Sequence, residues 1–412
     1  MTQPAAAATT EAPPAARPPG RDVVLTGFAA FLLLGWTVLL VPSLIREVQR
    51  SFDQSDGGMG FAYFVNAVVY VTGTVSVGVL AGRLPRRLLL AAGPALIAVG
   101  LLLIAAAGDW AAFLVGFLVM GMGAGIVDAG VNALFMDLYV GRAAMLNRLH
   151  VFFALGALTV PLVVGLSVGW GAPWQVVALA SAAAAAPLAI LLGTRRLPPT
   201  HPHVDAASAA QGSGERSPAD RRRVPLPLVV LAIAIGCYVA MELGVSSWLV
   251  RYLDDAPLEV ATLALSLFWA SLALGRLVSS FIVDRMGAVA FATTWSAACG
   301  VAILAAINVP SLPLAIACFA IAGFAAGPVY PMIMAIGGSL YPGRASMVSS
   351  MLASAAIVGS IVYPPLMGVV SEAAGMWFSM LGAALFAFAA AGCIWGAARL
   401  GRARGAGKAV TA

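Results

Sequence analysis

The feature that most constrains this chain is a series of about twelve apolar runs, each of 20 or more residues. A helix needs about 20 mostly apolar residues to cross the hydrocarbon core of a bilayer, which is about 30 Å thick. The runs are 23–45, 59–82, 88–107, 110–138, 144–169 and 174–194, then 225–250, 258–283, 288–307, 312–340, 345–370 and 376–398. The sequence therefore predicts an all-α membrane protein with twelve transmembrane helices.

The composition agrees with a lipid environment and argues against a soluble enzyme. Hydrophobic residues make up 61% of the 412 residues and charged residues only 10%, whereas a soluble domain averages about a quarter charged residues. The sequence has no nucleotide-binding glycine loop and no nucleophile elbow, and its four cysteines stand singly in apolar runs. We therefore expect a protein that is not an enzyme and that has no cofactor or metal site.

The distribution of basic residues predicts an orientation. The formal net charge is +6, and most of the 23 Lys and Arg residues fall on the side that also holds both chain ends. Examples are Arg83, Arg87, Arg195 and Arg196. Because cytoplasmic loops carry such an excess of positive charge, we expect a multi-pass protein of the cell (inner) membrane with both termini in the cytoplasm. The basicity then reports orientation and not a nucleic-acid partner, and we expect a monomer in the lipid bilayer.

One polar segment, residues 195–224, divides the apolar runs into two sets of six. It is rich in Pro, Gly and Ser and basic at both ends, as expected of a flexible cytoplasmic linker. It separates an N-terminal lobe, residues 23–194, from a C-terminal lobe, residues 225–398. Residues 1–22 are predicted to be a disordered cytoplasmic tail, and residues 399–412 a basic cytoplasmic tail.

A short loop occurs twice. The segment LYVGRAAM begins at Leu138 and LYPGRASM begins at Leu340, an offset of 202 residues (340 − 138). The same offset aligns other landmarks: Gly73 with Gly275, Arg83 with Arg285, Gly121 with Gly323, and Gly125 with Gly327. The two halves are therefore predicted to be copies of one six-helix unit in the same orientation, as in two-lobed transporters.

With these features the chain resembles the major facilitator superfamily over all twelve predicted helices. The loop GVLAGRLPRR (Gly78–Arg87) and its second copy SFIVDRMG (Ser280–Gly287) are similar to a cytoplasmic loop motif of that family. Within the family, GMGAGIVDAGVNAL (Gly121–Leu134), MLNRLHVFFALGALTVP (Met145–Pro161) and MELGVSSWLVRYL (Met241–Leu253) look like the fucose permease branch. The resemblance implies two pseudo-symmetric lobes, alternating access and sugar:proton symport, with protons as the coupling ion.

Asp128 is the first candidate for proton coupling. A charged residue inside a membrane helix is costly, so it is a functional hypothesis by default. Asp128 falls about ten residues from the cytoplasmic end of its helix, and Gly121, Gly125 and Asn132 lie on the same helical face. By resemblance, Asp128 occupies the carboxylate position at which a proton is taken up and released. The alternative is a buried acid held by a neighbouring helix.

Glu242 and His150 are the other two candidates for proton coupling. Glu242 shares a face with Tyr238 and Ser246, and burial disfavours the charged form of a carboxylate. His150 follows Asn147 by one turn, and a neutral imidazole can donate and accept at once. The structural alternatives are a hydrogen bond to a neighbouring helix for Glu242 and ordinary packing for His150.

The remaining candidates form two groups. Residues expected to bind substrate are Asn132, Asn147, Asn66, Tyr63, Trp36, Tyr238, Ser246, Trp269 and Tyr330. Residues expected to form a gate or cytoplasmic latch are Arg83, Arg276, Asp284, Arg285, Arg142 and Arg344, because the resemblance implies a latch made by the acid and arginine of the loop motif. Gly82 stands where the first copy of the motif would carry its acid, so the latch is expected to depend on Asp284 and Arg285.

Three functions fit this sequence. The favoured one is a secondary transporter of a small polar solute, a sugar by resemblance, through proton symport. Run 23–45 contains neither Asp nor Glu, whereas the sugar:proton members carry an acid there. The second is proton-coupled export of drugs or amphipathic metabolites, suggested by Met- and Trp-containing helices. The third is a membrane sensor without transport activity.

Overall fold

The computed structural model describes residues 21–139, 143–195, 197, 224–341 and 344–410. Arg142 lies outside these ranges, and so does the Asp284 side chain, so two of the predicted latch groups cannot be placed. Within the described residues, twelve helical spans are long and apolar enough to cross a membrane, which confirms the predicted all-α class.

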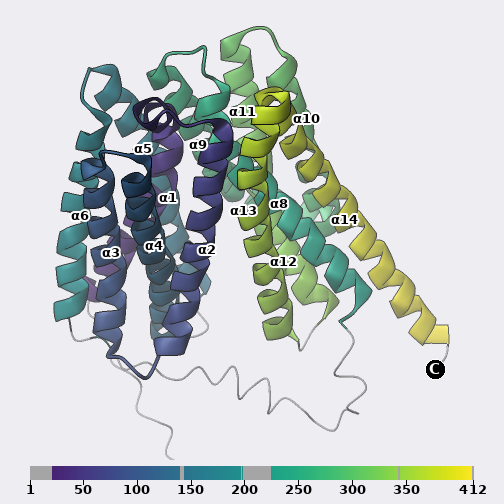
Figure 1. Cartoon of the computed structure of the whole chain (residues 1–412). Coiled ribbons are helices and arrows are strands. Elements are labelled where there is room, and N and C mark those ends of the chain that lie inside the picture. Colours follow the sequence, from purple (N-terminus) through teal and green to yellow (C-terminus); the bar gives the residue numbers. More distant parts are fainter. Residues whose placement is uncertain (1–20, 140–142, 196, 198–223, 342–343, 411–412) are drawn as a thin grey trace, which may run out of the picture.

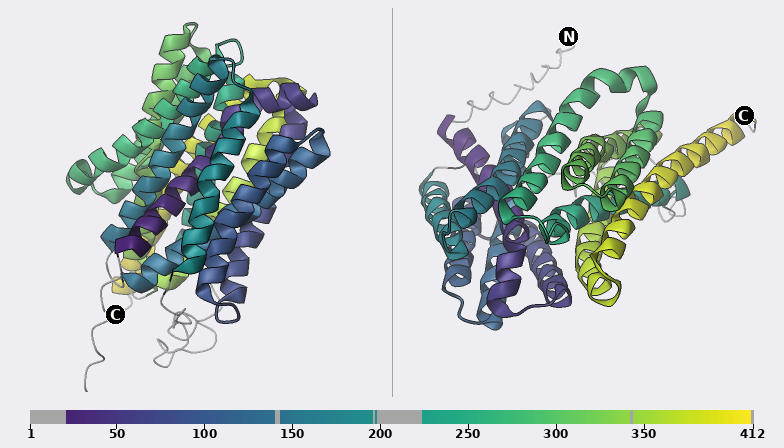
Figure 2. Two further views of the ribbon diagram at one scale, coloured as in Figure 1. Left: turned by 90° about the vertical axis from the view of Figure 1, so that its left-hand side faces the viewer. Right: turned by 90° about the horizontal axis from the view of Figure 1, so that it is seen from above.

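Helices from the two halves of the chain form two lobes side by side (Figures 1 and 2), and their labels follow Figure 1. The first lobe comprises α1 (Arg21–Phe52), α2 (Asp56–Leu80), α3 (Arg86–Ala106), α4 (Trp110–Leu138), α5 (Ala143–Gly169) and α6 (Trp174–Thr194). The second comprises α8 (Leu226–Tyr252), α9 (Leu258–Met286), α10 (Ala288–Asn308), α11 (Leu312–Ala326), α12 (Val329–Leu340), α13 (Ala345–Ala374) and α14 (Met376–Val410).

Two helices extend beyond their apolar runs. α1 ends at Phe52 and not near residue 45, and α14 continues to Val410, through most of the region predicted to be a tail. Hydropathy marks the part of a helix that lies in hydrocarbon, whereas a helix ends only where its hydrogen bonds stop. The extension of α1 places polar residues of the segment REVQRSF on a rigid helix end.

Two names for the ends of the molecule are used below. α6 ends at Thr194 and α8 begins at Leu226 at the same end, here called the linker end. The opposite end, where α1 ends at Phe52 and α2 begins at Asp56, is called the far end. In Figure 1 the linker end is at the bottom, and α2 and α13 lie closer together at the far end than at the linker end.

The repeat is visible in the packing of the glycines. A side chain on Gly73 would strike the Met122 carbonyl of α4, and one on Gly275 would strike the Phe324 carbonyl of α11. Met122 and Phe324 are themselves 202 residues apart in the sequence. In each lobe a glycine thus lets two helix backbones approach closely, as expected of a duplicated unit.

The tenth apolar run is broken in the middle. α11 ends at Ala326 and α12 begins at Val329, with Gly327 and Pro328 between them. Because proline has no backbone N–H, Pro331 leaves the Gly327 carbonyl without the donor that a continuous helix would supply four residues later. The break at Gly327 and Pro328 thus leaves a backbone carbonyl free inside the second lobe.

Candidate functional site

Asp128 of α4 lies in a small polar cluster within the first lobe. One carboxylate oxygen accepts a hydrogen bond from the Tyr70 hydroxyl of α2 at 2.9 Å, and the other accepts from the Asn132 side-chain amide at 2.9 Å. Each oxygen therefore has a neutral donor, and no cation of the described residues forms an ion pair with this carboxylate. The side chain is half-buried, so Asp128 is held by its neighbours but still accessible.

Glu242 of α8 has a different partner, a cation. Its carboxylate lies 3.6 Å from an Nη atom of Arg276 on α9. The Arg276 Nε donates to the Gly327 carbonyl at 3.0 Å, which is the carbonyl freed by the α11–α12 break. The distance to Glu242 is longer than the 2.7–2.9 Å typical of a charge-assisted hydrogen bond, and 37% of the Arg276 side chain is exposed. Arg276 thus retains donor capacity toward open space in the middle of the bundle.

The predicted latch role of Arg276 receives no support from this pairing, because its contacts are with Glu242 and Gly327 in the middle of the lobe. Arg83 and Arg285 are exposed at the linker end, and Arg344 is half-buried there. Their predicted latch roles stay predictions. The structure instead shows a buried ion pair at the linker end that the candidate list omits: Arg86 of α3 lies 2.7 Å from Asp137 of α4.

His150 and Asn147 are exposed on the first half of α5. The His150 ring makes an edge contact with Phe31 of α1, with ring centroids 5.5 Å apart. Exposure at this level of the bundle is consistent with contact to a solute, and it does not favour the packing alternative for His150. Their roles in coupling and substrate binding stay predictions.

Three predicted substrate residues use their polar groups inside a lobe. The Trp36 indole donates to the Ser181 hydroxyl at 2.8 Å, the Asn66 amide donates to the Phe117 carbonyl at 2.7 Å, and the Ser246 hydroxyl donates to its own helix. In this conformation these groups hold helices together. Binding of substrate by any of them would require these hydrogen bonds to be exchanged.

Four predicted aromatic residues lie in or near the middle of the bundle. Tyr63 of α2 packs edge-on against Trp248 of α8, and Trp269 of α9 packs against Phe153 of α5, so both contacts join the lobes. The ring centroids are 5.7 Å and 5.9 Å apart. Within the second lobe Tyr238 lies 6.3 Å from Tyr330, centroid to centroid. The Tyr63–Trp248 and Trp269–Phe153 contacts therefore hold the two lobes together in this conformation.

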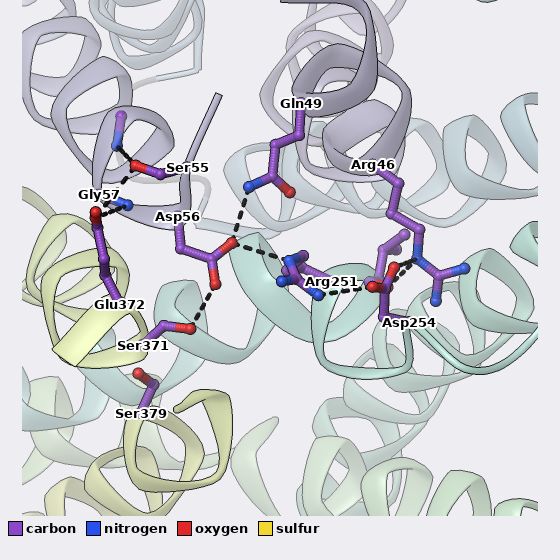
Figure 3. Close-up of polar contacts among 12 residues, drawn as sticks. Arg46, Gln49, Ser55, Asp56, Gly57, Arg251, Asp254, Ser371, Glu372 and Ser379 are labelled. Carbon is purple, nitrogen blue, oxygen red and sulfur yellow. Dashed lines mark hydrogen bonds and ion pairs between the residues drawn. The ribbon is translucent and has the colours of Figure 1, made fainter. Parts of the chain in front are cut away.

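The far end is closed by a polar network centred on Asp56, the first residue of α2 (Figure 3). One Asp56 oxygen accepts from Arg251 Nε of α8 at 2.9 Å and from Gln49 at 2.8 Å. The other accepts from the Ser371 hydroxyl of α13 at 2.5 Å. Arg251 also pairs with Asp254 at 2.9 Å. Asp56 therefore ties the first lobe to two helices of the second.

Two charged side chains at the far end cap helices of the opposite lobe (Figure 3). Glu372 of α13 accepts from the backbone N–H of Gly57 at 2.9 Å and from Ser55 at 3.1 Å, at the N-terminus of α2. Arg46 of α1 donates to the carbonyls of Val250, Leu253 and Ala256, where α8 ends. An anion at a helix N-terminus and a cation at a C-terminus both match the helix dipole, so each lobe stabilises a helix end of the other.

Backbone packing reinforces this closure. A side chain on Gly368 of α13 would meet the Asp56 carbonyl and Gly60 of α2. A side chain on Gly165 of α5 would meet Thr262 of α9. The contacts between lobes described above lie between the far end and the middle, so the structure is a conformation closed at the far end.

Sequence reasoning missed the far-end residues as a functional group. None of Arg46, Asp56, Arg251 and Glu372 was among the predicted site residues. The available signal was that charged residues of both halves gather at predicted helix ends on one side. Which of them pair could not be inferred, because the partners lie in different copies of the repeat.

Residues 23–307, more than half of the chain, match the sequence profile of the Major Facilitator Superfamily. A stretch of 150 residues is 31% identical to the sodium-dependent glucose transporter 1A of Mus musculus, covering 36% of this chain and 35% of that protein. The chain thus spans about a third of that relative's length. The glucose/mannose transporter GlcP of Bacillus subtilis (strain 168) is 20% identical over 348 residues, covering 83% of this chain and 86% of that protein.

A solved structure has the same fold. It is the crystal structure of a bacterial homologue of the human lysosomal transporter Spinster in an inward-facing and occupied conformation, with a TM-score of 0.77 and 14% sequence identity. The superposition covers 93% of this chain and 98% of that one. No group of three or more metal-ligating side chains occurs among the described residues.

Proposed function

The chain belongs to the Major Facilitator Superfamily, and from this premise we propose that it is a secondary transporter that moves a small hydroxyl-rich solute by alternating access. A sugar is the favoured substrate, because the mouse and Bacillus relatives bear the names of glucose transporters. Membership of a transporter family agrees with the expectation that the chain is not an enzyme.

The observation that carries the proposal is the pair of carboxylates in the middle of the bundle, one in each lobe. Asp128 is held by two neutral donors, and Glu242 by a partly exposed guanidinium. Since the Glu242–Arg276 pair is balanced in charge, a neutral solute fits it better than an ion does. Sugar hydroxyls can donate to the carboxylate and accept from the guanidinium.

We propose protons as the coupling ion, and no other cofactor. A proton on Glu242 would weaken its attraction to Arg276 and leave the guanidinium free for the solute. A proton on Asp128 would turn one carboxylate oxygen from an acceptor into a donor, so that its hydrogen bonds with Tyr70 and Asn132 must rearrange. Both changes alter polar groups in the middle of the bundle, where the two lobes must move relative to each other during alternating access.

The proposed orientation places the linker end in the cytoplasm of a cell (inner) membrane, on the strength of the basic residues at that end. The described conformation is then closed to the outside. We further propose that the protein works as a monomer, since each chain holds both lobes and both carboxylates.

The test is transport in liposomes that contain a pH-sensitive dye. Addition of D-glucose or another neutral sugar outside should lower the internal pH that the dye reports, as protons enter with the sugar. Asp128→Asn should abolish proton-driven accumulation but spare counterflow exchange. Asp109→Asn, a change at the N-cap of the same helix that keeps an acceptor oxygen, is the matched control.

Other outcomes would redirect the proposal. If transport responds only to a sodium gradient, sodium and not the proton is the coupling ion. The sodium gradient must be tested because the mouse relative is named a sodium-dependent transporter. A response only to lipophilic cations would favour export of drugs. No response to any solute would favour a sensor. Unchanged accumulation by Asp128→Asn would remove Asp128 from the mechanism.

A further inference from the structure

α9 carries two buried polar groups whose hydrogen bonds are unmet. The Ser266 side chain is 1% exposed and Trp269 is 3% exposed. Within the described residues, neither the Ser266 hydroxyl nor the Trp269 indole N–H has a hydrogen-bond partner. Since the large majority of buried side-chain polar atoms are bonded, each exception requires a reason.

A buried Trp and a buried Ser elsewhere in the protein are satisfied. The buried Trp174 donates to the Ser51 hydroxyl at 2.9 Å. The buried Ser43 hydroxyl donates to the carbonyl four residues earlier in its own helix at 2.6 Å. Ser266 sits in a continuous helix with such a carbonyl available and does not use it. Among the described residues the Tyr238 hydroxyl of α8 and the Thr293 hydroxyl of α10 also lack a partner, but only Ser266 and Trp269 lie one turn apart on the same helix.

The two residues lie along the seam between the lobes. Trp269 packs against Phe153 of α5, and Thr262, one turn before Ser266, meets α5 at Gly165. Arg276 lies seven residues beyond Trp269 on the same helical face, ~10 Å toward the linker end at 1.5 Å per residue. The face of α9 therefore runs from a closed seam at Ser266 and Trp269 to the exposed guanidinium of Arg276.

We propose that Ser266 and Trp269 form a far-side subsite, which binds a hydroxyl-rich solute when the far end opens and which α5 covers with Phe153 when that end closes. The indole N–H donates to a solute hydroxyl, the serine hydroxyl donates or accepts, and the indole face packs on the C–H face of a sugar ring. The ~10 Å to Arg276 exceeds one sugar ring, so this subsite is distinct from the inner one at Glu242 and Arg276. The inference rests on the proposed function.

Sided kinetics test this subsite. Trp269→Phe keeps the ring and removes the N–H, and Ser266→Ala removes the hydroxyl. In right-side-out vesicles each change should raise the KM for D-glucose, or for the fastest sugar of the panel, about fivefold, the usual effect of one hydrogen bond. In inside-out vesicles the KM should change less than twofold. Trp174→Phe and Ser43→Ala, where the lost group has an internal partner, are matched controls without a sided effect.

Labelling gives a second measurement that does not depend on kinetics. In a background without Cys237, Cys299, Cys318 and Cys393, Ser266→Cys should react with a membrane-impermeant thiol reagent added on the far side. The sugar should slow that reaction. A thiol that never reacts from the far side would overturn the subsite, as would equal KM changes from both sides or no change from either.

Failure of the inference and failure of the proposed function can be told apart. A wild-type protein that transports no solute of the panel overturns the proposed function and the subsite with it. An active wild type in which Trp269→Phe and Ser266→Ala have no sided effect overturns the subsite alone. The thermal stability of each purified variant shows whether it folds. If Trp269→Phe or Ser266→Ala fails to fold, the thiol labelling of Ser266→Cys decides whether the subsite exists.

Discussion

Asp56→Asn should open the far end, because Asp56 is the hub between the lobes. Its carboxylate is 9% exposed and accepts from Arg251 and Ser371 of the second lobe. A hydrogen bond to a charged group contributes about 1.5–3 kcal/mol. Arg251 is 29% exposed, so solvent screening places the loss toward the lower part of that range. A loss of about 2 kcal/mol lowers the ratio of closed to open molecules about 30-fold.

The assay is the distance between two spin labels at the far end, one on each lobe. Cysteines at Trp170 and Asp255, both exposed, would carry the labels after the native cysteines are removed. If about 99 in 100 wild-type molecules are closed, the variant should contain about three closed molecules for each open one. The longer distance should then become plainly visible in the distribution.

A control variant and a double variant make the result specific. Glu47→Gln removes an exposed i,i+3 pair with Arg50 in the same region, and it should leave the distances unchanged. Arg251→Gln combined with Asp56→Asn should open the far end little more than Asp56→Asn alone, because both remove the same interaction. An unchanged distance distribution in Asp56→Asn would refute the assignment of Asp56 as the hub.

Two further predictions follow from packing. Gly368→Val places a side chain against the α2 backbone, so it should prevent full closure at the far end and lengthen the same spin-label distance; a wild-type distance would contradict the close approach. Arg86→Gln should remove the buried ion pair with Asp137 and lower the free energy of unfolding by about 3 kcal/mol. Thermal melting in detergent measures this loss, and Arg87→Gln at the exposed neighbouring position should melt like wild type.

The fold was predictable because its main constraint is local. An apolar run of 20 or more residues specifies a spanning helix without reference to any partner, and the repeated loops then pair the halves. Helix ends were less predictable. α1 continues past its apolar run to Phe52, because residues such as Arg46 and Glu47 are good helix formers outside hydrocarbon.

The candidate site was predictable only in part. Asp128 and Glu242 stood out as charges inside apolar runs, and the helical face that joins Asp128 to Asn132 was correct. The partner of Glu242 was not predicted. Arg276 reaches Glu242 from another helix, and its position depends on a helix break. Contacts of this kind are set by packing between elements, which a single sequence does not encode in its spacing.

The offset of 202 explains how the two carboxylate sites came to differ. In the first lobe the position equivalent to Arg276 is Thr74 (276 − 202). The Thr74 hydroxyl lies 3.2 Å from the Tyr70 carbonyl of its own helix and 3.4 Å from the Gly125 carbonyl. In the second lobe Arg276 donates to the Gly327 carbonyl at 3.0 Å, which is the equivalent acceptor (125 + 202). Both halves therefore place a donor beside the same backbone group, a neutral hydroxyl in the first lobe and a cation in the second.

That exchange has a consequence for Glu242. A guanidinium in the middle of a membrane protein is costly unless a counter-charge lies nearby, and the position equivalent to Glu242 in the first lobe is the apolar Leu40 (242 − 202). Arg276 and Glu242 therefore both differ from the residues at the equivalent positions of the first lobe, Thr74 and Leu40. The second lobe gains a balanced ion pair with free donor capacity, while the first keeps Asp128 with neutral donors only. The asymmetry places the cation that can hold a solute in one lobe, and in the other an acid that has no ion pair among the described residues.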